Sequence, residues 1–196
     1  TVKLLADGVE RDRLTLNKDN NWQGKFAGLA KYSAVTGEEI RYTIEEVKVP
    51  NYNSVITGDT TGYTITNTNT ETIDIPVAKE WIGKKADSAT VYLFADNVQK
   101  DSVVLSEANH WRHTFKGLPK YKADGSEIVY TLREAAIVGY VTRIEGNAKQ
   151  GFTVVNRNTA TLEIPVKKVW VGPALKEITV KLLADGVERD RLTLNK

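Results

Sequence analysis

Residues 75–81 read IPVAKEW, and their alternating pattern indicates the fold. Side chains of a β-strand alternate between its two faces, so Ile75, Val77, Lys79 and Trp81 share one face. Three of these four residues are apolar, and that face is expected to pack against a core. The pattern therefore predicts a strand whose lysine, Lys79, points into the protein interior.

Two further polar residues interrupt apolar faces in the same way. Residues 128–134 place Glu134 on one face with Ile128, Tyr130 and Leu132, and residues 152–156 place Asn156 with Phe152 and Val154. The same patterns occur elsewhere in the chain: Glu46 with Tyr42 and Ile44, Asn67 with Tyr63 and Ile65, and Lys168 with Ile164, Val166 and Trp170. One lysine, one glutamate and one asparagine are thus expected in each repeat.

Internal repeats explain this recurrence. Residues 1–18, TVKLLADGVERDRLTLNK, return letter for letter as residues 179–196, and a weaker repeat aligns Trp22 with Trp111 and Trp81 with Trp170 at one constant offset. Such periodicity is typical of tandem arrays. We interpret residues 1–70 as module A without its first strands, residues 71–159 as a complete module B, and residues 160–196 as the first strands of the next module A.

Short β-strands account for almost the whole chain. Turn signals such as Asp7-Gly8 and Asp124-Gly125 separate alternating segments, and helical periodicity is hard to find. This pattern favours an all-β fold of tandem β-sandwich modules with Greek-key topology. The joints fall in residues 66–72 and 156–161, which are short, so the modules are expected to follow one another as a stiff rod.

Composition excludes several classes of function. The 27 basic and 25 acidic residues are spread along the chain, and no run of about 18 apolar residues occurs. We therefore expect no nucleic-acid partner and no membrane insertion in this segment. Cysteine is absent, and the only histidines, His110 and His113, would face opposite sides of a strand, so neither a nucleophilic triad nor a metal site is expected. No cofactor is expected either.

Burying any of the three polar residues alone is unfavourable by several kcal/mol. Desolvation lowers the pKa of a lysine and raises that of a glutamate, so the pair can exist as a neutral amine and a neutral acid. The amine can then attack the asparagine amide while the acid carries the proton to departing ammonia. The product is a Lys–Asn isopeptide bond. The alternative is a buried, hydrogen-bonded salt bridge in which no bond is made.

Five motifs occur in a fixed order: Lys-x-Trp at 79–81 and 168–170, Asn-x-Trp at 20–22 and 109–111, Gly-Leu-x-Lys-Tyr, Tyr-Thr-x-x-Glu and a closing strand that carries Asn. In these motifs the chain resembles the Cna B-type domain over essentially its whole length. The resemblance implies an inverse immunoglobulin-like sandwich, often with a spontaneous isopeptide bond. It assigns Lys79 and Asn156 to the bond in module B, with Glu134 as proton shuttle, and Lys168, Asn67 and Glu46 to the corresponding roles in module A.

The same resemblance implies a non-catalytic stalk of a Gram-positive surface adhesin, extracellular and anchored to the cell wall. Its partners would be neighbouring modules of the array, with a host extracellular-matrix ligand contacted through other domains. A turnover enzyme is not expected, because the chemistry consumes its own side chains once. Two alternatives stay open: a host-protein or glycan binding module, and a pilus subunit, for which Lys120 would be a weak candidate for sortase linkage.

Overall fold

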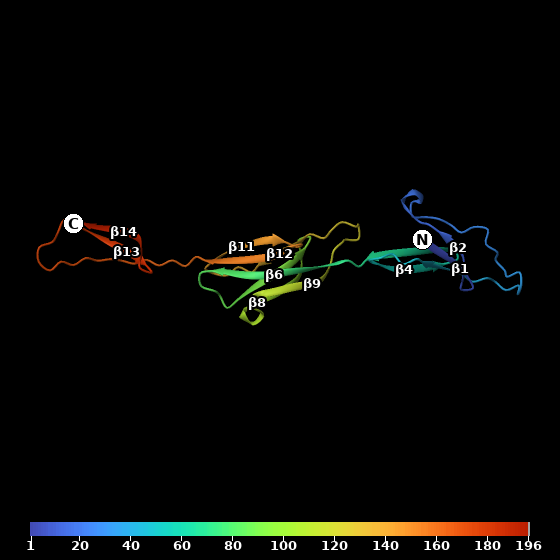
Figure 1. The fold of residues 1–196 in the computed structure, drawn as a ribbon, viewed down its shortest axis with the longest axis horizontal. Coiled ribbons are helices and arrows are strands. Elements are labelled where there is room, and N and C mark those ends of the chain that lie inside the picture. Colours follow the sequence, from blue (N-terminus) through green and yellow to red (C-terminus); the bar gives the residue numbers. More distant parts are fainter. Residues whose placement is uncertain (196) are drawn as a thin grey trace. The chain divides into compact units, whose positions relative to one another are not determined.

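The computed structural model describes residues 1–195, which form two compact units, residues 1–159 and residues 160–195. Apart from two single-turn 3₁₀ helices, the regular structure is entirely β (Figure 1). The expected all-β fold class is therefore confirmed. The division of the first unit into modules at residues 70 and 71 stays a prediction, and we keep the names module A and module B for residues 1–70 and 71–159.

Module A contains five strands in two sheets. The first sheet has the order β2-β1-β3 and the second is the pair β4-β5. The elements are β1 (Val2–Ala6), β2 (Val9–Leu14), η1 (Lys18–Asn20), β3 (Tyr42–Glu46), β4 (Tyr52–Asp59) and β5 (Gly62–Asn69). The turn between β1 and β2 uses Asp7 and Gly8, with φ of 51° and 81°. These left-handed values are those of a tight two-residue hairpin, as the sequence predicts.

Module B contains seven strands, again in two sheets. Their orders are β11-β12-β6-β9 and β10-β7-β8. The elements are β6 (Thr72–Ile82), β7 (Ser88–Ala95), β8 (Val98–Ser106), η2 (Glu107–Asn109), β9 (Arg112–Pro119), β10 (Tyr130–Glu134), β11 (Tyr140–Asn147) and β12 (Gly151–Asn158). The first strand, β6, lies between β9 and the last strand, β12, and it runs parallel to β12.

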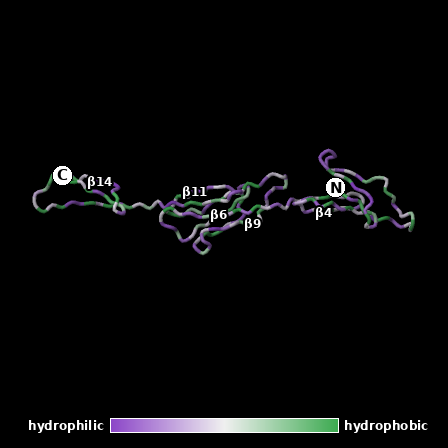
Figure 2. Tube along the Cα trace, viewed as in Figure 1, coloured by the Kyte–Doolittle hydropathy of each residue, from purple (hydrophilic) through white to green (hydrophobic). Residues whose placement is uncertain are grey.

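The core of module B lies between its two sheets. Hydrophobic and hydrophilic residues alternate along the strands, so each strand contributes one apolar face (Figure 2). One sheet supplies Ile75, Val77, Phe115 and Val154, and the other supplies Val91, Leu93, Leu105, Tyr130 and Leu132. Burying these side chains is the main favourable contribution to folding.

The structure corrects two expectations. Residues 164–170, expected as a lysine-bearing strand, are described but form no strand; regular structure in the second unit is the hairpin β13 (Glu177–Ala184) and β14 (Val187–Asn195). A strand has no hydrogen bonds of its own, so it needs a neighbour. Asp124-Gly125 lies, as its turn signal predicts, in a turn closed by an antiparallel bridge between Tyr121 and Glu127. His110 precedes β9 in a left-handed turn with φ of 53°, so it does not share a strand with His113.

Adjacent residues of β8 allow a test of the core. Leu105 is fully buried, whereas Val104 is exposed on the opposite face. Leu105→Ala should lower the free energy of unfolding of module B by about 2–5 kcal/mol, because it leaves a cavity among well-packed neighbours. Val104→Ala should change it by less than about 1 kcal/mol. Urea unfolding followed by tryptophan fluorescence measures both, and equal effects would contradict this assignment of the core face.

Candidate functional site: a buried Lys–Glu–Asn cluster

Lys79 occupies the inner face of β6, as the alternation predicts. Its side chain has 0% exposure, and its ammonium nitrogen Nζ donates hydrogen bonds of 3.1 Å to the carbonyl oxygens of Glu80 and Val154. Nζ also lies 4.1 Å from the centroid of the Trp81 ring, which makes a cation–π contact. The central position of β6 in its sheet thus places a lysine amine inside the sandwich.

Glu134 reaches the same point from the opposite sheet. It is the last residue of β10, and its Oε1 lies 3.6 Å from Lys79 Nζ. The side chain is as fully buried as that of the lysine. The other oxygen, Oε2, accepts a hydrogen bond of 2.6 Å from the Thr142 hydroxyl. This bond holds the carboxyl with Oε1 toward the amine.

Asn156 completes the cluster from β12. In the parallel pairing of β6 and β12, Lys79 lies opposite Val154, and Asn156 is the next residue on the same inner face. Asn156 is fully buried, and within the described chain neither its amide oxygen nor its amide nitrogen has a hydrogen-bond partner. Each buried amide group without a hydrogen-bond partner lowers the stability of the folded state by about 1–3 kcal/mol. The arrangement is therefore destabilising unless a reaction removes the unpaired groups.

Burial sets the protonation of the amine. Desolvation lowers the pKa of Lys79 below its ordinary value, and the neighbouring carboxylate of Glu134 opposes this effect without cancelling it. The buried ammonium of Lys79 therefore loses its proton more easily than the ammonium of an exposed lysine. A neutral amine beside a carboxyl group and an amide is the combination that acyl transfer requires.

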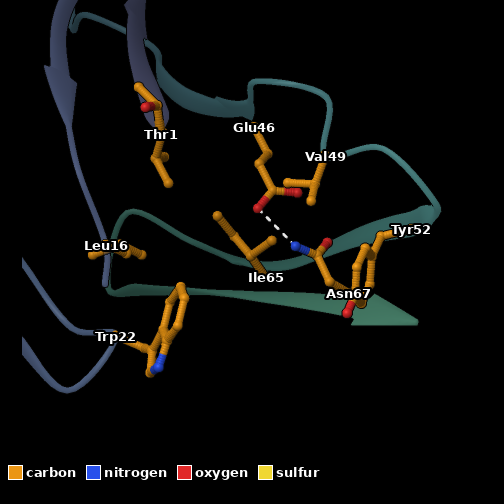
Figure 3. Close-up of a pocket in the computed structure, with 9 residues that line it drawn as sticks. Thr1, Leu16, Trp22, Glu46, Val49, Tyr52, Ile65 and Asn67 are labelled. Atoms are coloured by element: carbon orange, nitrogen blue, oxygen red, sulfur yellow. Dashed lines mark hydrogen bonds between the residues drawn. The ribbon is translucent and has the colours of Figure 1, made fainter. Parts of the chain in front are cut away.

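Module A contains two of the three corresponding residues in contact. Asn67 Nδ2 donates a hydrogen bond of 2.9 Å to Glu46 Oε1, at the edge of a cavity of about 450 Å³ (Figure 3). Glu46 Oε2 is buried and has no hydrogen-bond partner among the residues described. The sequence also assigned Lys168 to this site. Lys168 belongs to the second unit, where its Nζ lies 4.7 Å from the Trp170 ring centroid.

Sequence reasoning missed two supports of the cluster. Thr142 lies on β11 opposite Asn156, and its hydroxyl orients Glu134 although the residue itself is exposed. Tyr140 packs edge-on against Trp81 with ring centroids 5.2 Å apart. The sequence did contain a signal for Thr142. A residue with a hydroxyl group occurs two positions after a tyrosine in both modules, as Ser54 after Tyr52 and as Thr142 after Tyr140. Ser54 likewise lies opposite Asn67.

Metal-binding clusters and membrane-spanning helices are not found among the described residues. No group of three histidine, aspartate or glutamate side chains there is arranged to hold a metal ion. In the same part of the chain, no helix is long and apolar enough to cross a bilayer.

Comparison with known proteins agrees with the resemblance seen in the motifs. The sequence profile of the Cna protein B-type domain matches residues 1–68 and 75–157. The collagen adhesin of Staphylococcus aureus is 35% identical over 203 residues, which cover 95% of this chain and 16% of that protein. The chain thus spans about one sixth of the length of this relative.

Two crystal structures from the collagen-binding surface protein of S. aureus are also similar. A single B repeat unit is 32% identical, covering 81% of this chain and 86% of that chain with a TM-score of 0.43. A pair of B repeat units is 30% identical, and the match covers 99% of this chain and 54% of that chain with a TM-score of 0.45. On the profile match and the sequence identity, the chain belongs to the Cna B-type domain family.

Proposed function

We propose that this chain is a non-catalytic segment of the stalk of a Gram-positive surface adhesin, extracellular and anchored to the cell wall, whose modules are locked by Lys–Asn isopeptide bonds. One observation carries the proposal: the unsatisfied amide of Asn156 is buried with the Lys79–Glu134 pair. The collagen adhesin of S. aureus supports the adhesin context. Contact with a host matrix ligand belongs, in this proposal, to other domains.

The reaction uses only side chains of module B. The neutral amine of Lys79 attacks the side-chain carbonyl carbon of Asn156, while Glu134 in its acid form donates a hydrogen bond to the carbonyl oxygen. The new carbon–nitrogen bond forms as the carbon–nitrogen bond of the asparagine amide breaks. Glu134 gives its own proton to the leaving nitrogen, which departs as ammonia, and takes up the proton that the attacking amine loses, so its acid form is restored. The bond forms once, so there is no turnover.

Bond formation also solves the hydrogen-bonding problem of the core. The amide nitrogen of Asn156, a buried donor without a partner, leaves with the ammonia. The amide oxygen gains a donor if Glu134 is protonated. Two of the three buried polar groups become one secondary amide, with the Glu134 carboxyl beside it, and this relief favours the cross-link over the alternative of an unlinked salt bridge.

The position of the bond suits a load-bearing stalk. Tension enters module B through β6 and leaves through β12, which are its first and last strands and pair in parallel with Lys79 opposite Val154. A covalent link from Lys79 to Asn156 carries the load directly between these strands. The residues between them are then shielded from extension. By the relation derived for disulfides, closing so long a loop stabilises the module by about 4–5 kcal/mol.

Intact mass tests the bond in module B. In a Lys168→Ala background, which leaves module B as the only candidate, the protein should weigh less than its sequence by one ammonia, because the amide nitrogen has left. Lys79→Ala or Asn156→Ala should each restore the full mass. Lys116→Ala, which removes an exposed lysine of β9, should keep the loss of ammonia. A full mass in the Lys168→Ala protein would mean that the cluster is only a buried salt bridge.

Positioning by Thr142 has its own test. Thr142→Val keeps the shape of the side chain and removes the hydroxyl that holds Glu134 Oε2. The cross-link should still reach completion but at least about tenfold more slowly, because the carboxyl loses its orientation toward the amine. Mass spectrometry during refolding from urea gives the rate. Thr153→Val, a change on the outer face of β12, is the matched control, and equal rates in the two variants would rule out the positioning role.

The protonation of Lys79 can be measured without the bond. In Asn156→Ala, which cannot cross-link, an NMR titration should place the pKa of Lys79 below 10.5, because burial disfavours the ammonium. Adding Glu134→Gln should lower the pKa further, since the carboxylate charge raises it. The folded state then binds fewer protons than the unfolded state between the folded pKa and 10.5, so stability should rise with pH through that interval. A pKa at or above 10.5 would contradict the nucleophile assignment.

A further inference from the structure

The connector between β5 of module A and β6 of module B is short, and hydrogen bonds hold both of its ends. β5 ends at Asn69, and only Thr70 and Glu71 separate it from β6. The backbone N–H of Thr70 donates a hydrogen bond of 2.8 Å to the carbonyl oxygen of Asn51 in module A. The carbonyl oxygen of Glu71 accepts a hydrogen bond of 3.0 Å from the backbone N–H of Lys120 in module B. Both modules therefore hold the connector backbone.

The side chain of Glu71 adds a second set of contacts across the connector. Its Oε2 accepts a hydrogen bond of 3.3 Å from Nδ2 of Asn69, the last residue of β5. The backbone N–H of Glu71 in turn donates a hydrogen bond of 2.8 Å to Oδ1 of Asn69. On the other side, Oε1 of Glu71 lies 3.7 Å from the ammonium nitrogen Nζ of Lys120. The carboxylate thus contacts module A with one oxygen and module B with the other.

The ion pair of Glu71 and Lys120 is more sheltered than an ordinary surface pair. Its side chains are 35% and 33% exposed, whereas those of the pair Lys85 and Glu107 are 56% and 72% exposed. The Lys120 Nζ also lies 5.0 Å from the centroid of the Tyr121 ring. Exposed ion pairs contribute little, because water screens them and long side chains lose conformational entropy. Partial burial and the contact with the ring reduce both losses for this pair.

The sequence after module B repeats this connector with one decisive change. At the offset that aligns the modules, Thr159 and Ala160 correspond to Thr70 and Glu71. The backbone N–H of Thr159 donates a hydrogen bond of 2.8 Å to the carbonyl oxygen of Gly139, which repeats the bond that Thr70 makes. An alanine has no carboxylate, so it cannot form the ion pair that Glu71 forms. The two modules end alike, and the carboxylate is a feature of the first connector alone.

We propose that Glu71 is an ionic latch that restricts the orientation of module B relative to module A, and that a connector with alanine at this position bends more freely. The orientation of the modules depends on the few backbone dihedral angles of the connector. Glu71 restrains these angles by contacting Asn69 and Lys120 at the same time. In the stalk proposed above, stiff pairs of modules would then alternate with hinges. That mechanical role rests on the proposed function, whereas the latch does not depend on the isopeptide bond.

Spin labels on the two modules test the latch. Because the chain has no cysteine, Thr57→Cys on β4 and Ser102→Cys on β8 create two unique labelling sites, and both residues are exposed. Double electron–electron resonance then gives the distribution of distances between the labels. Glu71→Ala, which copies the residue of the second connector, should widen this distribution by at least about 1.5-fold, because the connector loses both contacts of the carboxylate. An unchanged width would overturn the proposal.

Partner and control variants identify the contact responsible. Lys120→Ala should widen the distribution as Glu71→Ala does, and the double variant should be no wider than either single variant, because all three remove the same ion pair. Lys122→Ala, which removes an ion pair of 3.4 Å with Asp96 inside module B, should leave the width unchanged. Equal widening by Lys122→Ala would assign the effect to the loop around residues 120–122 and overturn the latch.

Salt separates the ion pair from simple packing. Raising the ionic strength from about 0.01 M to about 1 M shortens the Debye length from about 30 Å to about 3 Å. The distribution should widen with salt in the labelled protein that retains Glu71 and stay constant in Glu71→Ala, which has no pair to screen. A response of equal size in both would contradict an ionic latch. If the width responds as expected while the intact mass shows no loss of ammonia in module B, the isopeptide bond is overturned and the latch stands.

Discussion

Burial of the Lys79 amine is the constraint on which the rest of module B depends. An ammonium group without water is strongly destabilising, so its neighbours must come from elements that surround it completely. Glu134 arrives from β10 in one sheet and Asn156 from β12 in the other, so the cluster requires both sheets in their native register. A slip of one residue in β6 would turn the lysine to solvent and Glu80 into the core.

Two distant segments that correspond to strands of module B have no regular structure in the described chain. Residues 23–30 and 161–171 correspond to β9 and β6, which are neighbours in module B, and neither forms a strand in the described chain. Their sequences have the alternation of strands, but a strand is stabilised by hydrogen bonds to a neighbour and by an apolar layer beneath it. In this fold the first strand of each module is therefore the element on which two other segments rely.

The alternation of side chains along strands predicted most of the site. It failed where the outcome depends on which distant segments pair with a strand. Alternation placed Lys79, Glu134 and Asn156 on inner faces, and the structure puts all three there because burial of apolar neighbours fixes the register. Alternation could not foresee that residues 164–170 lack a partner, since pairing depends on the rest of the fold. It also overlooked Thr142, an exposed residue whose hydroxyl turns inward to the carboxyl of Glu134.

Because the proposed reaction needs a buried Lys79, the module must fold before the bond can form. In the unfolded chain Lys79 is solvated and protonated at neutral pH, so it is a poor nucleophile, and Asn156 is a distant, hydrated amide. Folding reduces both obstacles: burial lowers the pKa of Lys79, and pairing of β6 with β12 brings Asn156 to the same inner face while the opposite sheet supplies Glu134. A bond made under these conditions is made only in correctly registered modules. The polar cluster thus lowers stability while the module is unlinked, and in the proposed mechanism the cross-link forms in the same structure that tolerates this cost.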